Sequence, residues 1–97
     1  MNSKIRDRET DKLFEGILQL KTVDECYAFF QDICTVSEIK AMAQRLQVAI
    51  MLYKNYKYSE ITEKTGASPA TISRVSRSLN YGADGYMIVL QRLSNLE

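Results

Sequence analysis

Small, hydroxylic and cationic side chains recur along one face of the stretch from residue 68 to residue 80. At about 100° per residue of a helix, they lie opposite the apolar residues Ile72, Val75 and Leu79. Short side chains allow close approach to a DNA major groove, hydroxyl and guanidinium groups bond to bases and phosphates, and residues 65–83 contain no acid. The pattern predicts a DNA-binding face made of Ser68, Pro69, Ala70, Thr71, Ser73, Arg74 and Arg77.

A helix-turn-helix over about residues 58–80 would position this face. Ser59 is expected to cap a short first helix that runs to Thr65, and Gly66 to supply the positive φ of the turn. Ser68 then takes the N-cap position and Pro69 the first helical position of a second helix, predicted over 69–80. In this motif the second helix enters the major groove.

The remaining periodicity predicts an all-α fold of about five to six helices in one domain, residues 1–97. An amphipathic helix is expected from Leu13 to near Lys21, with residues 1–12 either fraying or extending it. A capping-box spacing at Thr22 and Glu25 opens a second helix that ends near Cys34. Thr35 and Glu38 repeat that spacing. They open the longest helix, whose expected inward stripe is Ile39, Met42, Ala43, Leu46, Ala49, Ile50 and Tyr53. Asp84 is expected to cap a closing helix.

Composition argues against several classes of protein. The 97 residues are 45% hydrophobic and 26% charged, and they include no His. No nucleophile with a base and no phosphate-binding glycine loop is evident, so we expect no enzyme, no catalytic residue and no cofactor. Cys26 and Cys34 are interpreted as buried small apolar residues rather than a disulfide or metal ligands. No run of about 18 apolar residues exists, which predicts a cytoplasmic protein with no membrane contact.

Charge is unevenly distributed, and some basic residues have two interpretations. Residues 13–40 carry two basic and five acidic side chains, whereas residues 41–80 carry six basic and two acidic ones. Arg45 either snorkels at the edge of its helix or lines a cleft. The segment Lys54, Tyr56, Lys57 and Tyr58 is either an ordinary helix end or a contact for sugar-phosphate or unpaired bases.

The run from Ala41 to Leu79 resembles the Trp repressor family, above all in the segment Ala70-Thr71-Ile72-Ser73-Arg74 followed by Ser78-Leu79. It is most similar to the YerC/YecD-like branch on the segments 43–46, 65–68 and 78–82. The resemblance implies an all-helical, intertwined homodimer that binds double-stranded DNA and regulates transcription, as a repressor. The alternative from the residues alone is a helical interaction module that binds protein or RNA without an operator.

The resemblance also implies an effector pocket. Two arginines of the Trp repressor sandwich the indole of its co-repressor, and they match Arg45 and Arg74 here; a serine and a threonine of that pocket match Ser78 and Thr35. Val75 stands where the Trp repressor has glycine beside the ring. We therefore expect L-tryptophan to be a poor ligand, although a small-molecule effector remains compatible with the two arginines.

Overall fold

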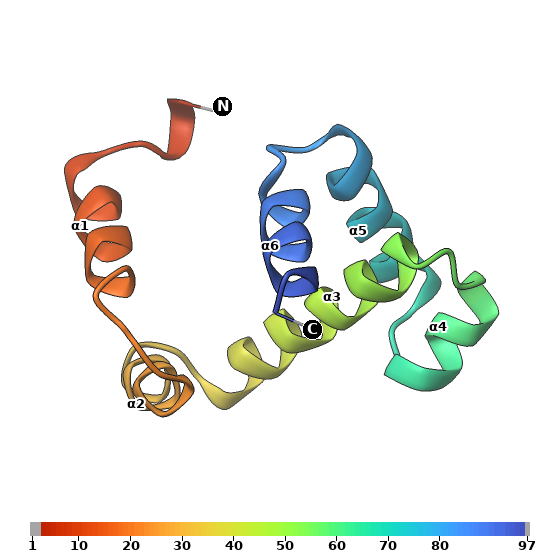
Figure 1. The fold of residues 1–97 in the computed structure, drawn as a ribbon, viewed down its shortest axis with the longest axis horizontal. Helices are drawn as coiled ribbons and strands as arrows, with labels where there is room; N and C mark the ends of the chain where they lie inside the picture. Colours follow the sequence, from red (N-terminus) through yellow and green to blue (C-terminus); the bar gives the residue numbers. More distant parts are fainter. Residues whose placement is uncertain (1–2, 97) are drawn as a thin grey trace. The chain divides into compact units, whose positions relative to one another are not determined.

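The computed structural model describes residues 3–96, and every regular element in that range is helical (Figure 1). This confirms the predicted all-α fold. A short 3-10 helix, η1, spans Ser3–Ile5. The α-helices are α1 (Arg8–Ile17), α2 (Val23–Ile33), α3 (Val36–Tyr53), α4 (Tyr58–Thr65), α5 (Pro69–Tyr81) and α6 (Gly85–Ser94). The chain divides into two compact units, Met1–Ile39 and Lys40–Glu97.

In the first unit, α1 begins and ends earlier than its apolar residues suggest. The Asp7 carboxylate accepts a hydrogen bond from the Thr10 N–H at 2.7 Å, which caps the helix before Arg8. Residues 8–12 therefore extend the helix ahead of Leu13, because a cap can begin a helix within a polar segment. The helix also stops at Ile17, short of Lys21.

Of the two predicted capping boxes, the one at Thr35 and Glu38 forms, and the one at Thr22 and Glu25 forms only in part. The Thr35 N–H donates to the Glu38 carboxylate at 2.7 Å, and the Glu38 N–H donates to the Thr35 hydroxyl at 3.1 Å, so α3 starts at Val36. At α2 the Thr22 hydroxyl accepts from the Glu25 N–H at 3.0 Å. The Glu25 carboxylate accepts a hydrogen bond from the backbone N–H of Lys21 at 2.8 Å, and not from the expected N–H of Thr22.

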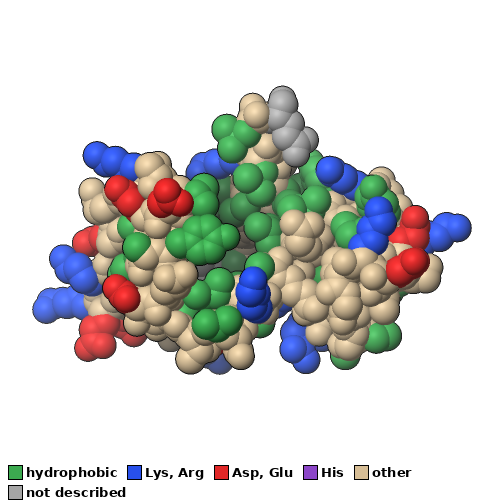
Figure 2. Space-filling view, turned by 90° about the horizontal axis from the view of Figure 1, so that it is seen from below, with side chains coloured by type: hydrophobic (Ala, Val, Ile, Leu, Met, Phe, Trp, Pro, Cys, Tyr) green, Lys and Arg blue, Asp and Glu red, His purple; other side chains and the backbone are tan. Residues whose placement is uncertain are grey.

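No residue of α1 or α2 is buried. Leu18 is 79% exposed and Val23 is 72% exposed, and Figure 2 shows hydrophobic side chains at the surface of this unit, on the left of the view. The prediction that both cysteines are buried was wrong for this chain, since Cys26 is exposed and Cys34 only half-buried; both are free thiols. Burial of these helices therefore needs apolar surface that the unit itself does not supply.

The second unit contains the core, and the last turns of α3 run through it. Figure 1 shows α4, α5 and α6 arranged around this half of the helix. The expected stripe on α3 was partly wrong: Met42 and Tyr53 remain about 40% exposed, whereas Val48 and Met51 are buried. Several helices cover α3 here, so a single stripe underestimates what it buries. The core residues are Val48, Ala49, Met51, Ile61, Ala67, Ile72, Val75 and Leu90.

Candidate nucleic-acid interface

The first helix of the candidate motif, α4, begins at Tyr58 with Lys57 at the N-cap position. The expected cap at Ser59 was wrong. The Glu60 carboxylate accepts a hydrogen bond from the Lys57 N–H at 3.0 Å and so satisfies the free backbone donor at the helix start. Ile61 lies on the inner side of α4 and is fully buried.

A small hydrogen-bond network fixes the turn after α4. Gly66 has a φ of 73°, the left-handed conformation expected of the glycine at this corner. The Thr65 hydroxyl donates to the Ile61 carbonyl at 2.7 Å and accepts from the Ala67 N–H at 3.1 Å. Gln44 of α3 donates its side-chain amide to the Thr65 carbonyl at 3.1 Å. Gln44 thereby attaches the turn to α3, a role that the sequence pattern did not reveal.

The second helix, α5, begins as predicted. The Ser68 hydroxyl accepts from the Thr71 N–H and donates to the Thr71 hydroxyl, both at 3.1 Å, and Pro69 occupies the first turn. The helix continues to Tyr81, one residue beyond the expected end. A Cβ at Gly82 would clash with the Ser78 carbonyl oxygen, so the backbone there requires glycine.

The outer face of α5 is free for contact. Ile72 and Val75 are buried and Leu79 is half-buried, so the apolar stripe packs inward as predicted. Of the expected DNA-contact residues, Thr71 is half-buried, and the exposed ones are Ser68, Pro69, Ala70, Ser73, Arg74 and Arg77. Neither Arg74 nor Arg77 forms an ion pair within residues 3–96. The salt bridge found in this range joins Lys12 to Glu15. Both guanidinium groups can therefore reach an external anion.

Three of the four residues expected around an effector line one cavity of about 370 Å³. Arg45 comes from α3, and Arg74 and Ser78 come from α5. This favours the cleft-lining interpretation of Arg45, although its Nε also donates to its own helix, to the Ala41 carbonyl at 3.3 Å. The fourth residue, Thr35, lies in the first unit and caps α3. Its place in the pocket stays a prediction.

Two further residues decide what the cavity can hold. Val75 is only 2% exposed and forms part of the wall. Tyr86 of α6 also lines the cavity, and sequence reasoning missed it because α6 shows only an apolar stripe there. The remaining lining residues are Ala41, Gln44 and Thr71.

The two short helices, the glycine turn and the inward stripe of α5 define a helix-turn-helix protein built on a helical scaffold. Its relatives agree with this class. Residues 8–94 match the model of a family described as Trp repressor protein. The uncharacterized protein YerC of Bacillus subtilis (strain 168) is 53% identical over 94 residues, which are 97% of this chain and 90% of YerC. The chain belongs to the Trp repressor family.

Solved structures show the same fold at high identity. A crystal structure of a proposed Trp repressor from Staphylococcus aureus superimposes with a TM-score of 0.92 and 49% identity, over 97% of this chain and 95% of that one. A TrpR-like protein from Eubacterium eligens ATCC 27750 gives a TM-score of 0.92 and 54% identity, over 99% of each chain. Within residues 3–96, no helix is long and apolar enough to cross a membrane.

Proposed function

We propose that this chain is a homodimeric, sequence-specific DNA-binding regulator that represses transcription, with α5 in the major groove. The observation that carries the proposal is the outer face of α5. There, exposed hydroxyls and two arginines that form no ion pair with any described residue lie over a buried apolar stripe. Arginine bonds bidentately to guanine, and serine and threonine bond to bases or phosphates. Ser68, Pro69, Ala70, Thr71, Ser73, Arg74 and Arg77 are the proposed contacts.

The homodimer is supported by the first unit. Its helices leave large apolar side chains more than half exposed, among them Phe14, Leu18, Val23 and Tyr27. Exposed apolar surface of this extent is typical of an interface rather than of a free monomer face. A second copy of the chain supplies matching surface, and a twofold dimer presents two copies of α5 to two half-sites about one DNA turn apart.

A gel-shift titration over a range of salt concentrations tests the proposal. The DNA would be fragments that co-purify with the protein from cells, each with a scrambled fragment of equal length and composition as control. We expect affinity for every fragment to fall as salt rises, since phosphate contacts release counterions. The specific fragment should keep an advantage of about 4 to 10 kcal/mol. Equal affinity for all fragments would favour a helical module that binds protein or RNA.

The cleft between α3 and α5 is the proposed effector pocket, with Arg45, Arg74 and Ser78 from one chain. L-tryptophan is expected to fit it poorly, because Val75, which is buried in the wall of the cavity, stands where the Trp repressor has glycine. Overpacking of this kind costs about 1 to 3 kcal/mol, or roughly 5- to 150-fold in affinity.

Calorimetric titration of L-tryptophan measures this effect. The wild type should give little heat, and Val75→Gly should recover binding if the valine alone blocks the ring. Tyr86→Ala is the matched variant, because it removes a second wall residue and leaves Val75 in place. Tight, saturable binding to the wild type, with a rise in DNA affinity, would contradict the prediction.

A further inference from the structure

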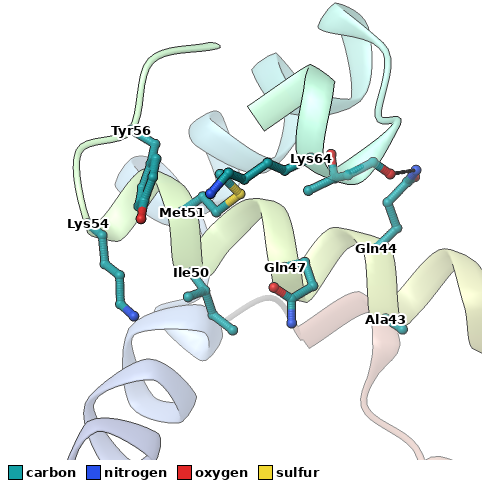
Figure 3. Close-up of a pocket in the computed structure, with 9 residues that line it drawn as sticks. Ala43, Gln44, Gln47, Ile50, Met51, Lys54, Tyr56 and Lys64 are labelled. Carbon is teal, nitrogen blue, oxygen red and sulfur yellow. Dashed lines mark hydrogen bonds between the residues drawn. The ribbon is translucent and has the colours of Figure 1, made fainter. Parts of the chain in front are cut away.

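A second groove, of about 510 Å³, lies between α3 and α4 (Figure 3). The two cavities share one lining residue, Gln44. Figure 3 shows Gln47 and Ile50 projecting from α3 on one side of the groove, while Lys64 extends along α3 from α4 on the other. The full lining is Ala43, Gln44, Gln47, Ile50, Met51, Lys54, Tyr56, Lys64 and Thr65.

The charged groups of this groove are all cationic. Lys54 and Lys64 line it, no acidic side chain does, and neither lysine forms an ion pair in the described part of the chain. The Lys64 ammonium lies 5.4 Å from the centroid of the Tyr56 ring. This cation–π contact holds the ammonium at the groove, which lowers the entropy lost when an anion binds.

The floor and the remaining polar groups suit a ligand with an apolar body. Met51 is 7% exposed and Ile50 is half-buried, and the Tyr56 ring adds an aromatic wall. The Gln47 amide has no hydrogen bond within residues 3–96 and can donate to an oxygen. Gln44 donates to the Thr65 carbonyl and so supports the wall. An apolar floor with donors beside it suits a ligand that is apolar at one end and polar at the other.

We propose that this groove binds small organic carboxylates with a short apolar or aromatic body. The carboxylate lies between Lys54 and Lys64 and accepts from Gln47, and the body lies on Ile50, Met51 and Tyr56. The geometry gives each part of such a ligand its partner: two ammonium groups for the charge, an amide donor for its second oxygen, and an apolar floor for the body. A bare phosphate would leave that floor unused.

The probe is sodium benzoate, titrated into the full chain while NMR follows the methyl groups of Ile50 and Met51. We expect saturable shifts of both. Lys54→Gln and Lys64→Gln should each raise the dissociation constant roughly two- to fivefold, the range for one exposed ion pair. Lys57→Gln is the matched control, because that lysine lies in the same segment and does not line the groove. It should leave the constant unchanged.

Two further probes test which part of the ligand is recognised: one keeps the ring without the charge, and the other is an anion without an apolar body. Benzamide, which has the same ring without the charge, should bind more weakly than benzoate, and inorganic phosphate should not shift the Met51 methyl. Equal shifts from phosphate would overturn the proposal in favour of a simple anion site. It would also be overturned if benzoate affinity followed Arg45→Gln rather than Lys64→Gln, or if the lysine variants weakened only the binding of duplex DNA.

Discussion

The two units of the chain differ in whether they bury their apolar side chains. Every buried residue within residues 4–96 belongs to the second unit, where α4, α5 and α6 close around the end of α3. The first unit has helices of ordinary length and well-formed caps, but none of its residues 4–39 is buried. Caps and hydrogen bonds define where its helices begin, and its apolar side chains stay at least partly exposed.

The difference indicates a division of roles. A self-sufficient core holds the helix-turn-helix rigid, which is what positioning side chains against DNA requires. Helices without a core of their own suit an interface, since their apolar side chains remain available to another chain. In the proposed homodimer, the second unit recognises DNA and the first unit joins the two copies.

The largest expected effect is in the second unit. Ile72→Ala removes a fully buried side chain by which α5 packs into the core, and it should lower the free energy of unfolding by about 2 to 5 kcal/mol. Ile72→Val is the graded control and should cost about 0.5 to 1.5 kcal/mol. Urea unfolding measures both. An alanine variant as stable as the wild type would show that this core does not stabilise the second unit.

Dilution tests the first unit. If its apolar side chains are covered by a second copy, a thousandfold dilution should lower the apparent stability by about 4 kcal/mol, because folding is then coupled to association. The melting midpoint should fall with concentration, and sedimentation should report a dimer at the higher concentration. A constant midpoint together with a monomeric mass would refute the proposed dimer and leave this surface unexplained.

Local signals in the sequence predicted the helix-turn-helix well. Gly66, Ser68 and Pro69 each act within a few residues, and the structure has them in the expected positions. The Ser59 prediction failed because Glu60, three residues after Lys57, satisfies the free N–H of the first helix instead. Two neighbouring signals competed there, and the sequence contains no measure of which is stronger.

Long-range features were less accessible. Tyr86 lines the cleft of Arg45 and Arg74 although it lies on another helix, and Val48 and Met51 are buried because three helices meet at α3. Periodicity along one helix cannot show which sides its neighbours cover. The cysteine prediction failed for a related reason: the apolar character of α2 indicates that it needs covering, but the covering surface is not in its own unit.

A smaller effect is expected from the exposed face of the second unit. Arg77→Ala should weaken DNA binding and leave folding intact, since Arg77 is exposed and forms no ion pair within residues 3–96. If Arg77 reads a guanine, the loss should be about 1 to 3 kcal/mol and confined to one operator position. If it contacts phosphate, the loss should be similar on all sequences.

Fluorescence anisotropy with single-base variants of the operator distinguishes these two roles. Arg92→Ala is the matched control, because Arg92 is an exposed arginine on α6, outside the helix-turn-helix. It should change affinity much less. If Arg77→Ala binds every sequence like the wild type at low salt, neither role is correct.

The smallest effect concerns the caps of the first unit. The backbone N–H of Thr35, followed by its hydroxyl, holds the pKa of the Glu38 carboxyl below its ordinary value near 4.5. Because the pKa is depressed in the folded state, the ionised Glu38 stabilises the fold above pH of about 4.5, and this contribution is lost as the pH falls through the folded-state pKa. The pKa of the Asp7 carboxyl is lowered in the same way, by the hydrogen bond from the Thr10 N–H.

Glu38→Gln isolates this contribution, since glutamine keeps a side-chain oxygen that can accept from the Thr35 N–H but cannot ionise. The variant should be slightly less stable than the wild type at neutral pH, and the two should converge as the pH falls below the folded-state pKa of Glu38. Thermal melts from neutral pH into the acid range measure the difference. Glu9→Gln is the control, because Glu9 is another exposed acid of the same unit. A gap between wild type and Glu38→Gln that persists in acid would mean that the charge is not what stabilises this cap.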